Sequence, residues 1–232
     1  MFTIANFIQA FPNDSGPIYR ETIDGGFPVE TFNTLSNLVF LGIIVYFAKK
    51  VFANPKKHLF LSGVLPVLSI GFVGGILYHG TRSAEIWLLM DWVPIRMLSL
   101  AAVVYFVLKW KTNWVTRAVL LAIILGANTG LRYIPMSTRW ENNLGYTISA
   151  LSILIPVLGY LFKTRFKNWP LVLSAFAIFA LAIFFRVLDK DLESDFFYMG
   201  THWLWHTFGG IAVFFLMKYI FLDNQRQPVG NG

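Results

Sequence analysis

Residues 168–187 read NWPLVLSAFAIFALAIFFRV, a run of twenty residues in which Arg186 is the one charged side chain. A helix of this length rises about 30 Å, which equals the hydrocarbon thickness of a typical bilayer. A soluble domain rarely contains so long an apolar run. The stretch therefore predicts a membrane-spanning helix, and it sets the fold class expected for the whole chain.

Six further segments have a similar length and apolar character. With the first stretch they cover approximately residues 34–53, 58–79, 85–109, 113–131, 144–162, 168–187 and 201–221. The composition agrees, because 56% of the 232 residues are hydrophobic and 13% are charged, an apolar share above that of typical soluble domains. We therefore predict an all-α integral membrane protein, with seven transmembrane helices forming a single domain over residues 1–232.

Basic residues are distributed unevenly between the two ends of the predicted bundle. Twelve belong to one end, namely Lys49, Lys50, Lys56, Lys57, Lys109, Lys111, Arg117, Lys163, Arg165, Lys167, Lys218 and Arg226. Six belong to the other, namely Arg20, Arg82, Arg132, Arg139, Arg186 and Lys190. The positive-inside rule then puts residues 1–32 outside and the tail, residues 222–232, in the cytoplasm. Because membrane topology explains the net charge of +7, we infer no nucleic-acid partner.

Three of the four histidines fall at the end with fewer basic residues. His202 and His206 are four residues apart at the start of the seventh span and so share a helix face, and His79 closes the second span. Asp91 lies early in the third span, whereas His58 lies at the opposite end. With no cysteine in the chain, a zinc ion would need histidine and carboxylate ligands. Three imidazoles leave a fourth tetrahedral position open to water, as in catalytic zinc sites.

Two other interpretations of these histidines are open. A single interfacial histidine usually bonds to backbone or water, but three at one depth beside a carboxylate favour a metal. A haem is the second alternative, since either His202 or His206 could pair with His79 as an axial ligand. Residues four apart on one helix cannot be the two opposite axial ligands of a haem, so this interpretation fits less well.

Four segments resemble the signature of the alkaline ceramidases and their bacterial relatives. They are Glu30-Thr-Phe-Asn33-Thr-Leu-Ser36-Asn37, Tyr78-His79-Gly-Thr81, Asp91-Trp-Val-Pro94 and His202-Trp-Leu-Trp-His206. That family belongs to a seven-helix superfamily that includes the adiponectin-type receptors and GPI-lipid remodelling hydrolases. The resemblance covers residues 21–206 and implies a zinc ion held by His79, His202 and His206, with Asp91 nearby and a lipid amide as substrate.

Together these features predict an intramembrane zinc-dependent hydrolase that cleaves the amide bond of an N-acylated lipid such as ceramide, at the extracytoplasmic side. Zinc-activated water would attack the carbonyl, with Asp91 as general base and then as proton donor to the leaving amine. The expected partner is a lipid with an acyl chain, and no protein partner is inferred. The family usually has a serine one helical turn before the first histidine, where this chain has Gly75. This departure favours the alternative, a non-catalytic receptor-like protein with a structural zinc site.

Acidic residues form two further groups. The first comprises Asp14, Glu21, Asp24 and Glu30. Oxygen ligands in a flexible loop suit Ca²⁺, and the resemblance implies calcium in this region, so Glu21, Asp24 and Glu30 are candidate ligands, with a solvated acidic loop as the alternative. The second group comprises Asp189, Asp191, Glu193 and Asp195, which we interpret as a solvated loop.

Polar residues near the start of the first span are expected to bond between helices. Asn33 and Asn37 share a helix face, so they could instead hydrogen-bond to a metal ligand. Arg96 lies inside the third span, but it is left out of the site because its side chain is equally expected to reach toward the interface.

Overall fold

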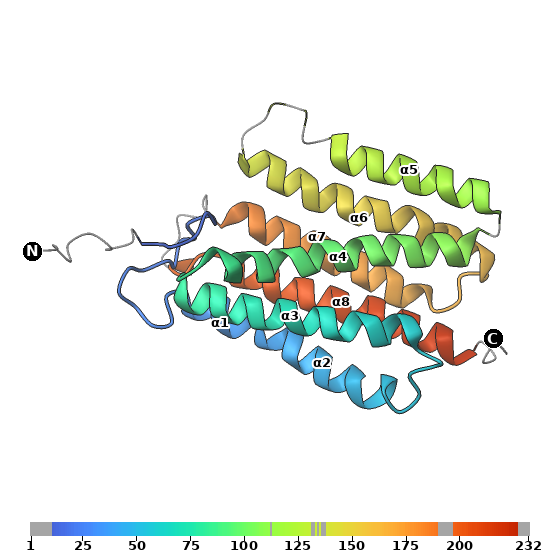
Figure 1. Cartoon of the computed structure of the whole chain (residues 1–232), viewed down its shortest axis with the longest axis horizontal. Coiled ribbons are helices and arrows are strands. Elements are labelled where there is room, and N and C mark those ends of the chain that lie inside the picture. Colours follow the sequence, from blue (N-terminus) through green and yellow to red (C-terminus); the bar gives the residue numbers. More distant parts are fainter. Residues whose placement is uncertain are drawn as a thin grey trace, which may run out of the picture.

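The structure, a computed structural model, describes residues 11–111, 113–130, 133, 135, 138–189 and 197–226 of the chain. The regular secondary structure in these residues is all helical. The helices are α1 (Thr31–Ser36), α2 (Leu38–Val51), α3 (Leu59–Thr81), α4 (Glu85–Trp110), α5 (Trp114–Gly130), α6 (Thr138–Lys163), α7 (Trp169–Leu188) and α8 (His202–Arg226). They run side by side along the long axis of the molecule (Figure 1).

Five helical segments are long and apolar enough to cross a membrane. They are Thr31–Val51, which combines α1 and α2, together with Leu59–Thr81, Glu85–Trp110, Trp169–Leu188 and His202–Arg226. The helix Trp114–Gly130 and the Thr147–Lys163 part of α6 are apolar but shorter. For the described residues this confirms an all-α protein with helices that could span a membrane, and every predicted span falls on a helix.

Some predicted boundaries differ from the structure. Helix α8 continues to Arg226, so residues 222–226, predicted as part of a tail, are helical. The Tyr160 hydroxyl of α6 lies 3.0 and 2.9 Å from the two carboxylate oxygens of Asp223, and this contact ties the last turns of α8 to α6. At the other end of the chain, the first helix begins at Thr31 rather than at residue 34.

The first predicted span is interrupted at Asn37, between α1 and α2. The Ser36 hydroxyl and the Asn37 carboxamide both donate to the backbone carbonyl of Asn33, each at 2.9 Å. Side chains that bond to a nearby carbonyl compete with the helical hydrogen bond of that carbonyl and bend the helix. The interruption gathers three polar residues beside the start of α8.

Helices α3 and α4 approach closely where α3 has two consecutive glycines. A Cβ atom built on Gly74 would lie 2.5 Å from Cβ of Met90 and 2.6 Å from the backbone nitrogen of Asp91. Small residues permit such close contacts between helices in a membrane. The contact fixes the position of Asp91 relative to the last turns of α3.

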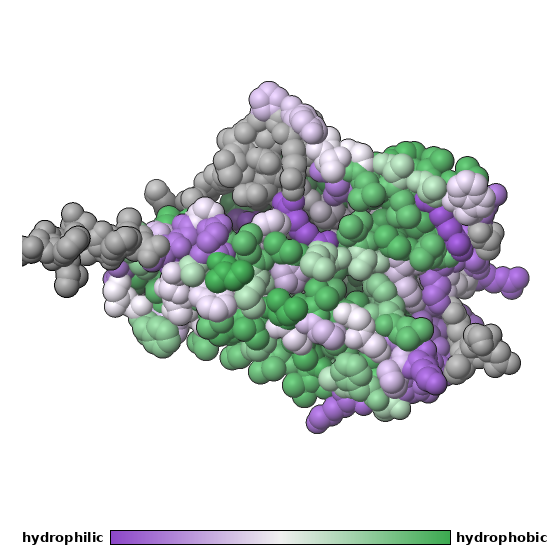
Figure 2. All heavy atoms as spheres, viewed as in Figure 1, coloured by the Kyte–Doolittle hydropathy of each residue, from purple (hydrophilic) through white to green (hydrophobic). Residues whose placement is uncertain are grey.

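Apolar side chains occupy both the interior and the outer surface of the bundle. Phe47, Leu61 and Phe106 are fully buried in the main core. Ile123 on α5 and Phe184 on α7 point outward and are 62% and 55% exposed. Figure 2 shows hydrophobic residues over much of the visible surface along the helices. Such an outer surface suits a lipid environment rather than water.

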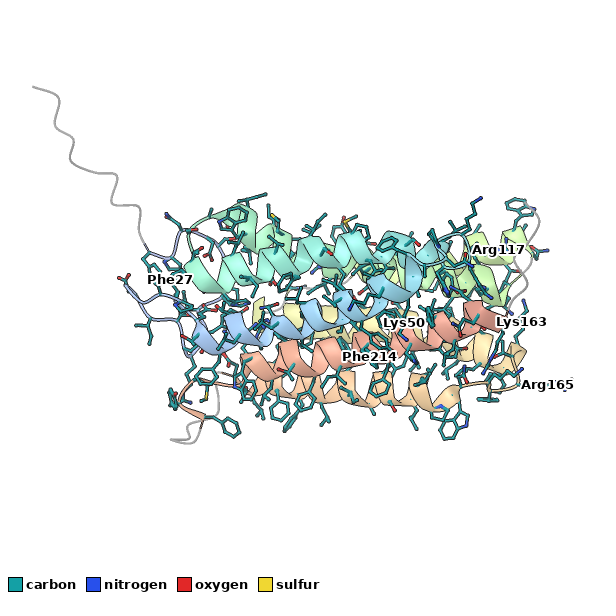
Figure 3. The ribbon with its side chains drawn as sticks, turned by 90° about the horizontal axis from the view of Figure 1, so that it is seen from below. Phe27, Lys50, Arg117, Lys163, Arg165 and Phe214 are labelled. Atoms are coloured by element: carbon teal, nitrogen blue, oxygen red, sulfur yellow. The ribbon has the colours of Figure 1, made fainter. Side chains whose placement is uncertain are left out.

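The two ends of the bundle differ in their charged residues. Arg117, Lys163 and Arg165 lie at one end, and Phe27, in the loop before α1, lies at the other (Figure 3). Helix α8 begins at the Phe27 end, so the predicted histidine ligands lie away from these basic residues.

Candidate metal centre

Three buried histidines from two helices meet at the end of the bundle near the N-terminal loop. His79 is in the last turn of α3, and His202 and His206 lie in the first two turns of α8. One ring nitrogen of each histidine lies within 4.8 Å of the others. Within the described ranges, this trio is the one group of histidine, cysteine or acidic residues with the geometry to hold a metal ion. The fold thus brings together the three predicted ligands.

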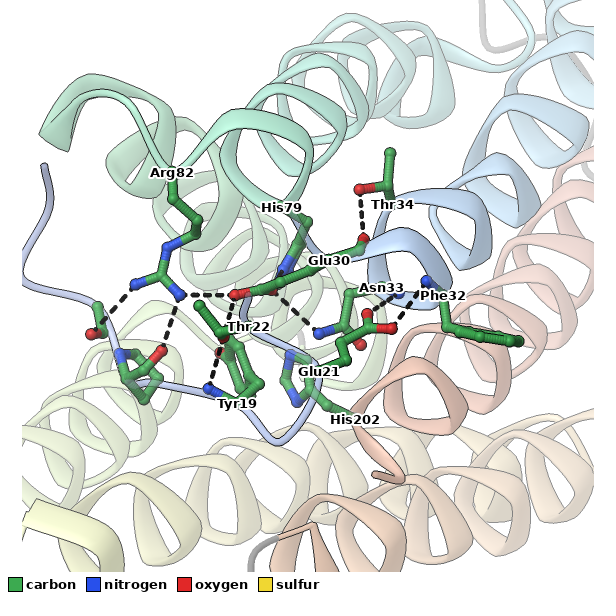
Figure 4. A network of polar contacts seen from close by, with 12 residues as sticks. Tyr19, Glu21, Thr22, Glu30, Phe32, Asn33, Thr34, His79, Arg82 and His202 are labelled. Carbon is green, nitrogen blue, oxygen red and sulfur yellow. Dashed lines mark hydrogen bonds and ion pairs between the residues drawn. The ribbon is translucent and has the colours of Figure 1, made fainter. Parts of the chain in front are cut away.

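The orientation of His79 is set by Glu30. The two side chains are fully buried, and His79 Nδ1 lies 2.5 Å from Glu30 Oε2 (Figure 4). A histidine that donates one ring N–H to a carboxylate presents its other nitrogen to a metal, with fixed tautomer and ring orientation. The Nε2 atom of His79 is therefore the one that is available to a metal.

His206 is held by the polar residues at the break between α1 and α2. Its Nδ1 lies 2.9 Å from Ser36 Oγ, 3.2 Å from the Asn33 carbonyl oxygen and 3.3 Å from Asn37 Nδ2. These contacts engage Nδ1 and leave Nε2 for a metal. Asn33 and Asn37, which the sequence placed near the ligands, are thus direct neighbours of His206.

His202 begins α8 and is positioned by a helix cap. Asp189 Oδ1 accepts the backbone N–H groups of Thr201 and His202 at 2.7 and 2.8 Å. An aspartate is favourable there because it satisfies otherwise unpaired N–H groups and faces the positive end of the helix dipole. Asp189 is buried, so its interpretation as part of a solvated loop was wrong. The other members of that acidic group, Asp191, Glu193 and Asp195, lie outside the described residues.

The donor set fits a zinc ion. His79 Nε2 and His202 Nδ1 are buried and, among the described residues, have no hydrogen-bond partner. An unpaired buried polar atom costs about 1–3 kcal/mol, which a bound ion would offset. Zinc binds imidazole nitrogens at about 2.0–2.1 Å in tetrahedral geometry, which puts the nitrogens about 3.3 Å apart. The ring nitrogens lie within 4.8 Å of one another, so binding an ion would draw them closer together.

Asp91 and Gly75 lie next to each other beside the histidines. A Cβ atom on Gly75 would lie 2.5 Å from Asn37 Oδ1 and 2.9 Å from Asp91 Oδ1. The absence of a side chain at Gly75 therefore leaves room for the polar ends of Asn37 and Asp91. A serine at this position would displace one of them.

Two of the three histidines open onto a long cavity of about 400 Å³ inside the bundle. His202 and His206 line one end, and Ile220, eighteen residues beyond His202 on α8, lines the other. At 1.5 Å per residue this separation is about 27 Å, close to the thickness of a bilayer core. Apolar side chains that line it include Leu61, Val64, Leu68, Ile153, Phe176 and Leu216. Asp91 lines the same cavity.

The cavity also contains residues that sequence reasoning missed or set aside. Arg186 lines it, with its guanidinium carbon 5.2 Å from the centre of the Trp205 ring. Arg96, left out of the site, lines it as well. Tyr19, from the N-terminal loop, stacks on His202 with ring centroids 3.8 Å apart. A charged residue inside a predicted span is a signal that could have identified Arg186, whereas nothing in the sequence indicated Tyr19.

The structure does not assemble the predicted calcium ligands into one site. Glu21 caps α1, accepting the backbone N–H groups of Asn33 and Phe32 at 2.6 and 2.9 Å, and Asp24 is exposed. Burial raises the pKa of Glu21 above its ordinary value, and these two hydrogen bonds oppose the effect.

The carboxylate of Glu30 is saturated with donors. Its Oε1 accepts from Thr22 and Arg82, both at 2.6 Å, and its Oε2 accepts from His79 and Asn33 at 2.5 and 3.1 Å. Burial would raise the pKa of Glu30, but the contact with His79 and the other hydrogen bonds lower it overall. A carboxylate has about four acceptor positions, so calcium would have to displace one of these donors.

Comparison with known protein families and with characterised proteins gives no match for this chain. The resemblance to the alkaline ceramidases therefore rests on the four short segments alone. Each of these segments contributes a residue to the centre or its surroundings, including Glu30, His79, Asp91 and His206.

Proposed function

We propose that this chain is a multi-pass membrane hydrolase that holds Zn²⁺ with His79, His202 and His206 and cleaves the amide bond of an N-acylated lipid. The proposal takes all seven predicted spans as membrane-crossing. The observation that carries it is a buried three-histidine group, beside a carboxylate, at the end of a long and mainly apolar cavity.

The ligand set favours catalytic over structural zinc. Structural sites are usually closed by four protein ligands, whereas three histidines leave a position for water or substrate. When bound in such a site, Zn²⁺ activates water and polarises a carbonyl oxygen. Glu30 and the polar residues at the break between α1 and α2 orient the imidazoles of His79 and His206 for this task.

Asp91 is the candidate for proton transfer. It lines the same cavity as His202 and His206, and the close α3–α4 contact fixes its backbone. In the proposed reaction its carboxylate takes the proton of the attacking water and delivers it to the leaving amine. The side-chain oxygens of Asn37 and Asp91 both lie in the space that the absent side chain of Gly75 leaves open.

The cavity supports a lipid substrate. Its apolar length would take an acyl chain, and the polar linkage would then lie at the histidine end. An amide rather than an ester follows from the resemblance to the alkaline ceramidases. The products would be a fatty acid and an amine-bearing headgroup.

The distribution of basic residues supports an orientation for the reaction. The twelve residues at one end and six at the other favour a cytoplasmic C-terminus and an outside N-terminus. The histidines lie at the end with fewer basic residues, so the active site would face the extracytoplasmic side.

Metal analysis combined with a panel of N-acyl lipids tests the proposal. Detergent-purified protein is expected to contain close to one zinc ion per chain and to release fatty acid from at least one lipid amide. The His202→Ala/His206→Ala double variant should lose both properties.

Any other outcome of this experiment would favour a different kind of protein. Bound zinc without release of fatty acid from any amide or ester lipid would contradict the hydrolase and favour a receptor-like protein with structural zinc. A Soret absorption band would indicate a haem instead. Protein without any metal would contradict the whole site.

A further inference from the structure

Arg82 is a buried arginine directly after α3 that the proposed chemistry does not use. It is 1% exposed, and its backbone is left-handed, with φ at +47°. That conformation favours glycine and is costly for other residues. Because an arginine occupies this position despite the cost, we expect its guanidinium to make stabilising contacts.

The guanidinium joins the N-terminal segment to the helices. Its Nε and Nη2 donate to the two carboxylate oxygens of Asp14 at 2.9 and 2.6 Å. Its Nη1 donates to the Pro17 carbonyl at 3.1 Å and to Glu30 Oε1 at 2.6 Å. The planar fork of an arginine makes such bidentate contacts, and a lysine cannot.

These contacts reach the histidines from two directions (Figure 4). Glu30 accepts from both Arg82 and His79, so one carboxylate links the arginine to a metal ligand. Tyr19, two residues after the Pro17 contact, stacks on His202 and lines the cavity. Arg82 thus holds the partner of one ligand and the segment that covers another.

The same contacts balance charge in the protein interior. The side chains of Asp14, Glu30 and Arg82 are all fully buried. Two neighbouring buried carboxylates disfavour each other's ionised form unless a cation lies between them. A divalent ion could neutralise two such carboxylates. In this chain the guanidinium of Arg82 lies between them instead.

We propose that Arg82 is a positioning residue that replaces a bound cation. It closes the N-terminal segment over His202 and holds Glu30 against His79, so the centre assembles without calcium. The inference rests on the proposed zinc site for one of its two measurements. The other measurement, access to the cavity, is independent of zinc.

Zinc affinity is the first measurement, made by competition with a chromophoric chelator. Arg82→Gly suits the left-handed backbone but removes the guanidinium, and is expected to weaken zinc binding about 10–100-fold. Arg165→Gly is the matched control, because Arg165 also has a left-handed backbone, with φ at +53°, but is exposed at the opposite end. Its affinity should equal that of the wild type.

Arg82→Lys provides a second variant that keeps the charge without the fork. It should fall between the wild type and Arg82→Gly, and it keeps the test valid if the glycine variant does not fold. Unchanged zinc affinity in a folded Arg82→Lys and a folded Arg82→Gly would overturn the positioning role.

Access to the cavity is the second measurement. The chain has no cysteine, so Ser149→Cys, a near-isosteric change at a cavity-lining position on α6, gives a single reactive thiol. Adding Arg82→Gly should raise its rate of labelling by a charged thiol reagent on the order of tenfold, because the covering segment opens. Adding Arg165→Gly should leave the rate unchanged, and equal rates in both double variants would overturn the closure.

Added calcium tests whether the positive charge beside Asp14 and Glu30 comes from Arg82 or from a bound ion. The labelling rate and zinc affinity of protein with Arg82 intact are expected to be the same with and without added Ca²⁺. A calcium-dependent increase in zinc affinity or in closure would overturn the replacement of the cation by Arg82. If the wild type binds no zinc but labelling still depends on Arg82, the proposed hydrolase fails while the closure by Arg82 stands.

Discussion

Glu30 engages Nδ1 of His79, 49 residues away, and so leaves Nε2 to face the candidate metal position. Its four hydrogen bonds come from the N-terminal loop, α1, the end of α3 and the residue that follows α3. In the sequence Glu30 belongs to a group of four acidic residues, for which a calcium site and a solvated loop were both open. The pairing with Arg82 joins residues 52 apart, and no local pattern in the chain announces it.

The Glu30→Gln variant tests whether the carboxylate of Glu30 orients His79, because it replaces one carboxylate oxygen with an amide nitrogen. A carboxamide cannot accept all four hydrogen bonds or favour the required form of His79, so zinc affinity is expected to fall about 10–100-fold. The measurement is chelator competition. Asp24→Asn is the matched control, since Asp24 belongs to the same acidic loop but is exposed. Equal losses in the two variants would argue that loop charge, rather than orientation of His79, governs affinity.

Asp91→Asn separates proton transfer from metal binding. Asp91 is outside the three-histidine group, so the variant should retain zinc at wild-type stoichiometry. Turnover of a lipid amide should drop about 10²–10⁴-fold, the usual range for loss of a general acid or base. Both quantities are measured on the same preparation. Loss of zinc with turnover would instead make Asp91 a ligand, and unchanged turnover would remove it from the mechanism.

At the scale of helices, the sequence predicted what depends on local spacing. His202 and His206 share a face because they are four residues apart, and each apolar run falls on a helix, the first run on both α1 and α2. The break at Asn37 was missed because it arises from side chains that bond to the Asn33 carbonyl. The cap that Asp189 gives α8 was missed for a similar reason, since the two backbone N–H donors lie twelve and thirteen residues beyond the accepting aspartate.

The close contact between α3 and α4 can be tested by adding a methyl group at Gly74. Gly74→Ala should lower the free energy of unfolding in detergent by about 1–3 kcal/mol, because its Cβ would overlap the backbone of α4. Gly42→Ala on α2 is the control, because a Cβ there meets no atom within 4 Å. That variant should be as stable as the wild type or slightly more stable. Similar destabilisation in both would mean that helix geometry, rather than close packing, explains the Gly74 effect.

At the scale of the molecule, the sequence predicted that the histidines and the larger basic group lie at opposite ends. It could not predict the cavity, whose walls combine side chains from the N-terminal loop and six helices. Which side chains face such a space depends on the rotation of each helix, and helices that are apolar on all sides do not specify that rotation. Arg186 is an example, because the sequence places it at the histidine end, but only the packing of α7 against α8 turns its side chain toward the cavity.

The orientation of the whole bundle is the remaining prediction, and the cysteine-free chain allows a direct test. Ile23, in the loop before α1, and Lys167, between α6 and α7, are exposed at opposite ends. If the larger basic group is cytoplasmic, an impermeant thiol reagent added to intact cells should label Ile23→Cys, and it should label Lys167→Cys only after permeabilisation. The permeabilised sample controls for thiol reactivity at both positions. The reverse pattern would turn the histidine centre toward the cytoplasm, and a lipid substrate would then have to enter from the inner leaflet.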